Sequence, residues 1–75
     1  MAGTRSMNPN LHLTAREREV VREIVAGRKN GEIAVALGIK EQAVKNVLSV
    51  VYQKCHVRNR LELAVFALKH HLLSR

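Results

Sequence analysis

The chain has 75 residues, 25% of them charged, and its thirteen lysines and arginines against six acidic residues give a formal net charge of +7. A chain of this length forms at most one domain with a modest core, which leaves little room for an enzyme pocket. Its single cysteine excludes an internal disulfide framework, and no apolar run approaches the roughly eighteen residues of a membrane span. Such a basic excess favours a polyanionic partner. Nucleic acid is the first candidate, and an acidic membrane surface is the second.

The first segment, residues 1–12, is polar, contains the only proline and has no hydrophobic periodicity. This composition predicts a disordered lead or the end of a linker, followed by one domain over residues 13–75. The polar start also differs from the apolar core of a secretory signal peptide. Together with the lone cysteine, it predicts a reduced, cytoplasmic environment.

A first helix is predicted over residues 15–26. Thr14 and Glu17 have the spacing of a capping box, in which a hydroxyl and a carboxylate each accept a hydrogen bond from a backbone N–H at the helix start. Gly27 stands where a left-handed residue would end the helix. The apolar residues between them recur at helical spacing: Val20, Val21, Ile24 and Val25.

A helix-turn-helix is predicted in the middle of the chain. Asn30 is expected to cap a short helix over residues 31–37, which Gly38 ends. Only three residues, of which this glycine is the first, separate the short helix from a longer one over residues 41–55. Two helices joined by a short turn that contains glycine are typical of the helix-turn-helix motif.

The helix over 41–55 has two contrasting faces. Its first residue, Glu41, is its only carboxylate, whereas a solvated helix face ordinarily carries several. One face is an apolar stripe, which predicts contact with the core, and it includes the cysteine as a small hydrophobic residue. The stripe is Val44, Val47, Leu48, Val51 and Cys55, and the opposite face is Gln42, Lys45, Asn46, Ser49 and Gln53.

The polar face has the chemistry of a surface that reads DNA. Amide side chains offer a donor and an acceptor together, which match the adenine edge in the major groove, and a lysine matches guanine or a phosphate. A carboxylate there would repel phosphates, which explains why acids are missing. A neutral, solvated face is the alternative, which the adjacent helix-turn-helix and the positive charge disfavour.

A last helix is predicted over residues 60–73, with Asn59 and Glu62 at its start. It has two apolar stripes on roughly opposite faces, and one small core covers only one of them. The other stripe predicts a second copy of the chain as partner. The stripes are Leu61, Val65, Leu68 and Leu72, and Leu63, Phe66 and Ala67. Because no segment alternates with period two, the expected fold class is all-α, a four-helix bundle with a central helix-turn-helix.

Three segments together resemble the LuxR/NarL (GerE-type) DNA-binding domain of bacterial transcription regulators. They are LTAREREVV at 13–21, GRKNGEIAVALGI at 27–39 and AVKNVLSVVYQKCHVRNRLELA at 43–64. The resemblance implies sequence-specific binding of double-stranded DNA in transcription regulation, with the third helix in the major groove. Full-length members of this family, such as two-component response regulators, usually carry an N-terminal sensor domain. The chain is therefore either an excised C-terminal domain or a stand-alone regulator.

The resemblance also implies a role for individual residues. It implies weak homodimerisation through the last helix, with Leu63, Ala64 and Ala67 in the core, and RNA polymerase as a further candidate partner. No enzyme activity and no cofactor, metal, small-molecule or membrane partner is expected. The base-facing residues would be Gln42, Lys45, Asn46 and Ser49; the phosphate contacts Lys29, Asn30, Lys40 and Lys54; and the dimer stripe Leu61, Val65, Leu68 and Leu72.

Several positions depart from the family pattern. Lys40 replaces the usual hydroxyl at the start of the third helix, which costs about 1 kcal/mol of capping. Ala43 and Val47 replace Thr and His, Gly31 replaces a common Lys, and Cys55-His56 replaces Leu-Gly. These departures favour an alternative, a dimerisation or protein-interaction module with weakened DNA binding.

Other functions have weaker support in the sequence. Apart from His12, the histidines and the cysteine form two adjacent pairs, Cys55-His56 and His70-His71, rather than the spacings that let metal ligands converge. No nucleophile elbow, glycine-rich phosphate loop or paired carboxylates suggest catalysis. The last helix is amphipathic and ends in basic residues, so binding to a membrane surface is a further alternative.

Overall fold

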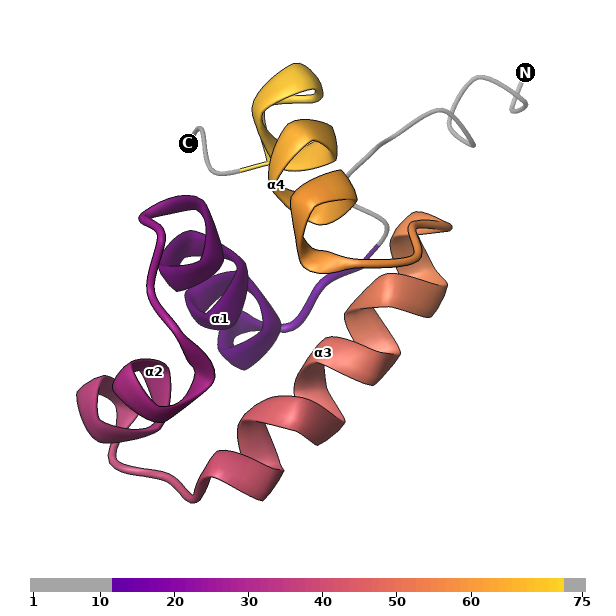
Figure 1. Cartoon of the computed structure of the whole chain (residues 1–75). Helices are drawn as coiled ribbons and strands as arrows, with labels where there is room; N and C mark the ends of the chain where they lie inside the picture. The colour runs from indigo at the N-terminus through magenta and orange to yellow at the C-terminus, as the bar shows by residue number, and fades with distance from the viewer. Residues whose placement is uncertain (1–11, 73–75) are drawn as a thin grey trace.

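The computed structural model describes residues 12–72 and contains, over that range, four helices and no strand. This confirms the predicted all-α fold (Figure 1). The expected disordered lead over 1–12 lies, apart from His12, outside the described residues. The helices are α1 (Ala15–Val25), α2 (Asn30–Leu37), α3 (Glu41–Cys55) and α4 (Arg60–Lys69).

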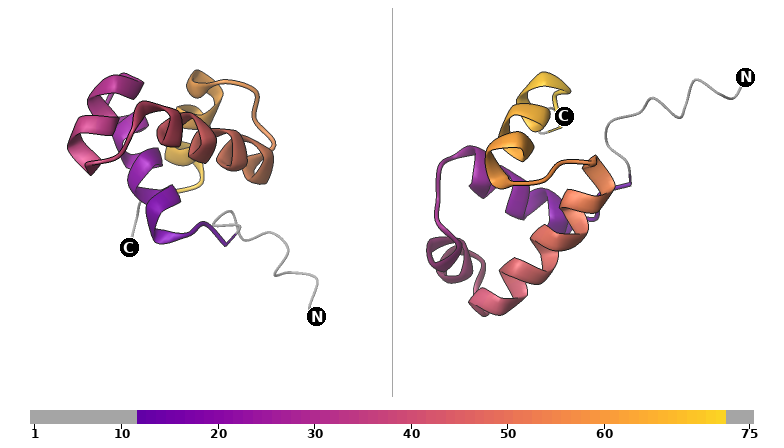
Figure 2. Two further views of the ribbon diagram at one scale, coloured as in Figure 1. Left: turned by 90° about the horizontal axis from the view of Figure 1, so that it is seen from below. Right: turned by 45° about the vertical axis from the view of Figure 1, so that its right-hand side comes forward.

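The other three helices all pack against α3, the longest helix. α2 packs near its N-terminal end and α4 near its C-terminal end, and α1 lies beside it and contacts α4 as well (Figures 1 and 2). The apolar stripe predicted for α3 is buried as expected, apart from Val47, which is only partly covered. The core consists of Leu13, Val20, Val21, Ile24, Ile33, Ala34, Val44, Leu48, Val51, Cys55, Leu63, Ala67 and Leu72.

The helix starts follow the predicted caps with one exception. In the capping box of α1, the Glu17 N–H donates to Thr14 Oγ1 at 3.1 Å, and the Thr14 N–H donates to Glu17 Oε1 at 2.8 Å. The prediction that Asn30 caps α2 is wrong, because Asn30 is already helical and Lys29 precedes the helix. There the Glu32 carboxylate accepts a hydrogen bond from the Lys29 backbone N–H at 2.8 Å.

All four helices of the described chain end in the same way. A residue with positive φ follows the helix, and the next backbone N–H donates to a carbonyl five residues earlier, as in a Schellman motif. These bonds are 3.1 Å after α1, 3.0 Å after α2 and α3, and 2.9 Å after α4. The residues with positive φ are Gly27, Gly38, His56 and His71. Two of the four positions therefore hold histidine where glycine is favoured.

We expect His56→Gly to raise the free energy of unfolding by about 1 kcal/mol. The φ of His56 is 57°, a conformation that costs a residue with a Cβ atom roughly 1–2 kcal/mol. Its side chain is exposed, so removing it sacrifices little packing. Thermal unfolding should shift upward by about 4–8 °C for a domain of this size. His70→Gly is the matched control, because φ there is −103° and no strain is relieved; an equal gain at both sites would contradict this explanation.

The end of α4 corrects the sequence prediction. The helix stops at Lys69 rather than at 73, and the Leu72 N–H donates to the Ala67 carbonyl at 2.9 Å. This turn carries Leu72 back into the core, where its side chain is 2% exposed. Its assignment to the exposed dimer stripe is therefore wrong, because the prediction extended the helix past its actual end.

An ion pair joins the start of α1 to the end of α3. Lys54 Nζ lies 2.8 Å from Glu17 Oε1 and also donates to the His12 carbonyl at 3.3 Å. Burial of the Glu17 carboxylate acts to raise its pKa. Hydrogen bonds from Lys54 and from the Thr14 backbone, with the charge of Lys54, outweigh burial and hold the pKa of Glu17 below its usual value.

The lowered pKa of Glu17 predicts a loss of stability in acid. A carboxyl group with a depressed folded-state pKa stabilises the fold above its unfolded pKa, and this contribution disappears as the pH falls through the folded pKa. At pH 7, we expect Glu17→Gln to lower the free energy of unfolding by about 1–2 kcal/mol. Below the folded-state pKa of Glu17 the difference from wild type should vanish, as urea titrations followed by circular dichroism would measure.

The matched control for Glu17 is Glu19→Gln on the same helix. Glu19 pairs with Arg16 at 3.3 Å, but both side chains are nearly half exposed. Exposed pairs of this kind contribute little. If the difference in the free energy of unfolding between wild type and Glu17→Gln persists unchanged at low pH, the role assigned to the ion pair is contradicted.

Candidate nucleic-acid interface

The polar face of α3 is an exposed surface in the folded chain. Its four predicted base-facing residues lie within an arc of about 100° on the helix, at 100° per residue. The buried residues Val44, Leu48 and Val51 hold the opposite side of the helix on the core. The structure thus places four polar residues together on one solvent-exposed face: Gln42, Lys45, Asn46 and Ser49.

Two of these side chains are hydrogen bonded to one another. Gln42 Nε2 donates to Asn46 Oδ1 at 3.1 Å, across one turn of the helix. Gln42 is the second residue of α3, so the pair lies in its N-terminal half. Recognition helices of this motif contact bases mainly through their N-terminal residues.

A groove of about 390 Å³ runs between α3 and the start of α2. Sequence reasoning missed one of its key residues, Arg60, at the start of α4. Arg60 Nη1 donates to Asn30 Oδ1 at 2.9 Å, and Nη2 donates to the Arg28 carbonyl at 2.6 Å. The guanidinium therefore ties the start of α2 to the start of α4, a contact that periodicity within single helices could not indicate. The groove is lined by Asn30, Lys45, Leu48, Ser49, Tyr52 and Arg60.

Three of the four predicted phosphate contacts are placed around this face. Lys29 and Lys40 are exposed and stand directly before α2 and α3, and Asn30 lines the groove. Within residues 12–72, Lys29, Lys40 and Lys45 form no ion pair, so their ammonium groups are not held by a carboxylate of the described chain. Lys40 also gives α3 no side-chain cap, as its chemistry predicts.

Lys54 does not belong to this set. It follows Lys45 by nine positions, which places it about 180° away around α3. Its ammonium group faces α1, where it is bonded to Glu17 and His12. The prediction that Lys54 contacts a phosphate is therefore wrong, and the residue has a structural role instead.

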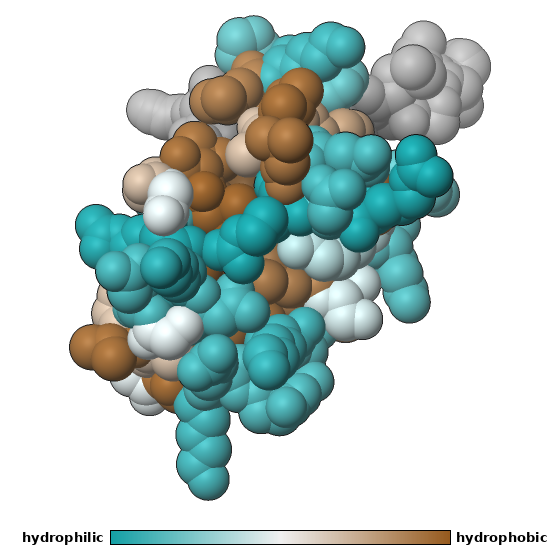
Figure 3. Space-filling view, in the orientation of Figure 1, coloured by the Kyte–Doolittle hydropathy of each residue, from teal (hydrophilic) through white to brown (hydrophobic). Residues whose placement is uncertain are grey.

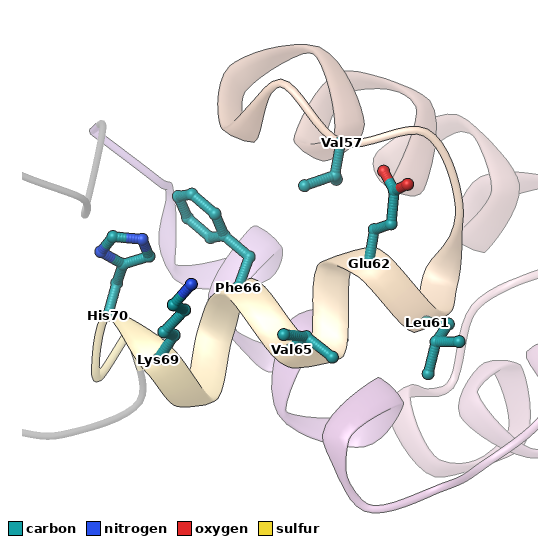
Figure 4. Close-up of a pocket in the computed structure, with 7 residues that line it drawn as sticks. All are labelled: Val57, Leu61, Glu62, Val65, Phe66, Lys69 and His70. Carbon is teal, nitrogen blue, oxygen red and sulfur yellow. The ribbon is translucent and has the colours of Figure 1, made fainter.

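The exposed face of α4 forms a second surface, which is apolar. Leu61, Val65 and Leu68 recur at helical spacing and are 72%, 51% and 63% exposed, and the hydrophobic patch is visible over α4 in Figure 3. Leu63 and Ala67 on the other side of the helix are buried, as predicted. A groove of about 410 Å³ borders the patch and is lined by α4 and the turn before it (Figure 4).

The other sequence features do not form a site in the described part of the chain. Between residues 12 and 72, no three His, Cys, Asp or Glu side chains are grouped so that they could hold a metal ion. In the same range, no helix is both long enough and apolar enough to cross a membrane. Cys55 is buried, and burial, together with the charge of Glu17, raises the pKa of its thiol. It packs as a small hydrophobic residue.

The bundle, the three-residue turn between α2 and α3, and the exposed polar face of α3 define a helix-turn-helix domain. Residues 11–67 match the GerE family model, bacterial regulatory proteins of the luxR family. The chain belongs to this family.

Several transcription regulators are similar to the chain. It is 45% identical over 60 residues to the uncharacterized transcriptional regulatory protein YhcZ of Bacillus subtilis (strain 168), covering 80% of this chain and 28% of that protein. It is 41% identical over 63 residues to the transcriptional regulatory protein LnrK of the same organism, covering 84% of this chain and 29% of that protein. It is 42% identical over 50 residues to the transcriptional regulatory protein DesR, also from that strain, covering 67% of this chain and 25% of that protein. The chain thus spans between a quarter and a third of the length of these relatives.

Proposed function

We propose that this domain binds double-stranded DNA in a sequence-specific manner and serves as the DNA-reading part of a transcription regulator, with α3 in the major groove. One observation carries the proposal. The exposed face of a helix held on the core consists of Gln42, Lys45, Asn46 and Ser49, with no carboxylate among them. This set can donate to and accept from base edges, and it does not repel the phosphates that flank them.

Phosphate contacts would set the register of the domain on the duplex. Lys29 and Lys40 precede two helices whose N-terminal N–H groups favour anions. Asn30, held by Arg60, keeps both N–H donors of its amide for a phosphate oxygen. Contacts of this kind orient a protein on DNA, whereas the base contacts of α3 would specify the sequence.

The proposed DNA binding is tested by fluorescence anisotropy with random-sequence duplex DNA, titrated from low to physiological salt. We expect log K to fall linearly with log salt, with a slope that corresponds to roughly three to six phosphates per protomer. If no binding occurs even at about 50 mM salt, where phosphate contacts dominate, the proposal fails. A protein-interaction module that works through α4 would then take its place.

We also propose that two copies of the domain pair through α4. The support is the apolar stripe of Leu61, Val65 and Leu68, which lies on a helix whose opposite face is already buried. Within residues 12–72, these side chains are more exposed than the other large aliphatic ones except Val35. Pairing of two protomers would suit a two-fold target site, because dimers of this motif read two half-sites.

Leu68→Glu should weaken the dimer by at least tenfold. The substitution places a carboxylate in an apolar contact, where it would be desolvated without a partner. Because Leu68 is 63% exposed in the protomer, the fold should be unaffected. Analytical ultracentrifugation over a range of concentrations measures the effect. Lys69→Gln, one residue along, changes the net charge by the same single unit and is the control for charge; a Leu68→Glu variant that dimerises as well as wild type would refute the role of the stripe.

A further inference from the structure

The hydrogen bond between Gln42 and Asn46 has a consequence for which base the domain recognises. We propose, on the basis of the DNA binding proposed above, that these two residues act as one unit that reads a single adenine. Gln42 contacts the base, and Asn46 holds the Gln42 amide in the orientation that adenine requires. The unit lies at the N-terminal end of α3 and is fully on its solvent side.

The hydrogen-bonding capacity of the pair supports this assignment. Each amide has two N–H donors and two acceptor lone pairs on its oxygen. The 3.1 Å bond from Gln42 Nε2 to Asn46 Oδ1 uses one donor of Gln42 and one lone pair of Asn46. Gln42 therefore keeps its whole carbonyl oxygen and one N–H, an acceptor and a donor on the same amide group.

Adenine is the base that matches this remaining pair of groups. In the major groove adenine presents its N6 amino group as donor and N7 as acceptor. The Gln42 oxygen accepts from N6, and the remaining Gln42 N–H donates to N7. Guanine presents two acceptors, N7 and O6, so the Gln42 oxygen would face O6 without a hydrogen between them. Cytosine and thymine each present only one polar group to the amide.

The bond to Asn46 also prepares Gln42 for binding. A free glutamine on a helix surface samples many rotamers and loses this freedom when it contacts a base. The hydrogen bond restricts Gln42 before DNA arrives, and it discourages rotation of the amide by 180°, which would bring the oxygens of Gln42 and Asn46 together. Asn46 is thus a positioning residue, and its loss should weaken discrimination at the base that Gln42 contacts.

The test begins with the random-duplex titration, which establishes whether the chain binds DNA at all. Preferred duplexes are then enriched from a randomised library with the wild-type chain. Each adenine of the preferred duplex is replaced in turn by 7-deazaadenine, which lacks N7, or by purine, which lacks the amino group. We expect one adenine at which each replacement weakens binding about tenfold or more.

Variants then connect that adenine to the two amides. Gln42→Ala should abolish the effect of both adenine replacements on binding. Asn46→Ala should reduce this effect at the same base pair. The double variant should distinguish adenine from the other bases no worse than Gln42→Ala does. Gln53→Ala is the matched control, because it removes the same amide from an exposed position of α3 about 16 Å further along. It should leave the preference unchanged.

The two proposals fail in different ways. Suppose that wild type binds random duplex DNA but Gln42→Ala leaves its base preference unchanged. The reading unit is then overturned, and DNA binding stands. The same conclusion follows if the base preference depends on Gln42 but is for guanine. Additive losses from Gln42→Ala and Asn46→Ala at two different base pairs would overturn the unit as well. If wild type does not bind random duplex at low salt, DNA binding and the reading unit fall together.

Discussion

Lys45→Glu is expected to lower the affinity for duplex DNA by about 100-fold or more at low salt. Removing a lysine that contacts a base or a phosphate costs about 1–3 kcal/mol. The introduced carboxylate adds repulsion from the phosphates on both sides of the groove. Lys45 is exposed at the edge of the polar face that lines the groove beside α2, and no other lysine or arginine lies on this face of α3. Anisotropy titrations with the same duplex measure the change.

Arg22→Glu is the control for charge alone. It makes the same change in net charge on α1, at an exposed position about opposite the buried residues Val20 and Ile24. If binding depends on the polar face of α3, Arg22→Glu should reduce affinity only slightly, through the weaker overall field. Equal losses in the two variants would mean that the basic charge of the chain acts non-specifically and that α3 has no special role.

Leu63→Ala should have the largest effect on stability, a loss of about 2–5 kcal/mol in the free energy of unfolding. The Leu63 side chain is 0% exposed and lies where α4 packs on the rest of the core. Domains of this kind are stable by only about 5–15 kcal/mol, and a chain of 75 residues belongs to the lower end of that range. The variant should therefore unfold at a markedly lower urea concentration.

Leu61→Ala, two residues earlier, is the matched comparison. Leu61 is 72% exposed, so its truncation should change the stability of the protomer by no more than about 0.5 kcal/mol. It should instead weaken self-association. The pair of variants separates the two faces of α4, because one should affect folding and the other assembly. Similar losses of stability at both positions would contradict the assignment of inner and outer faces.

Most of the fold could be predicted from the sequence because its signals are local. Thr14 and Glu17 identify the start of α1 by their spacing, and Gly27 and Gly38 occupy the left-handed positions that end two helices. The bounds of α3 agree with the prediction, since its apolar stripe is regular from one end to the other. In each case the signal comes from residues close together in the sequence, each at most four positions from the next.

The parts that could not be predicted depend on contacts between distant residues or on unfavoured conformations. The bonds of Arg60 to Asn30 and of Lys54 to Glu17 join residues 30 and 37 positions apart. The helical periodicity of Leu72 continues that of α4, and only the left-handed His71 turns it inward. Because histidine rarely adopts this conformation, no local signal indicated that α4 ends at Lys69.

The central claim is that the polar face of α3 contacts DNA, and the most direct test is an NMR titration of the isotope-labelled chain with duplex DNA. We expect the side-chain amide signals of Gln42 and Asn46 to shift, together with the backbone signals of Lys45 and Ser49. The signals of residues on the outer face of α1, such as Arg22, should change little. If the α3 signals stay in place while DNA shifts signals elsewhere, α3 is not the helix that reads the duplex, and the proposed interface is wrong.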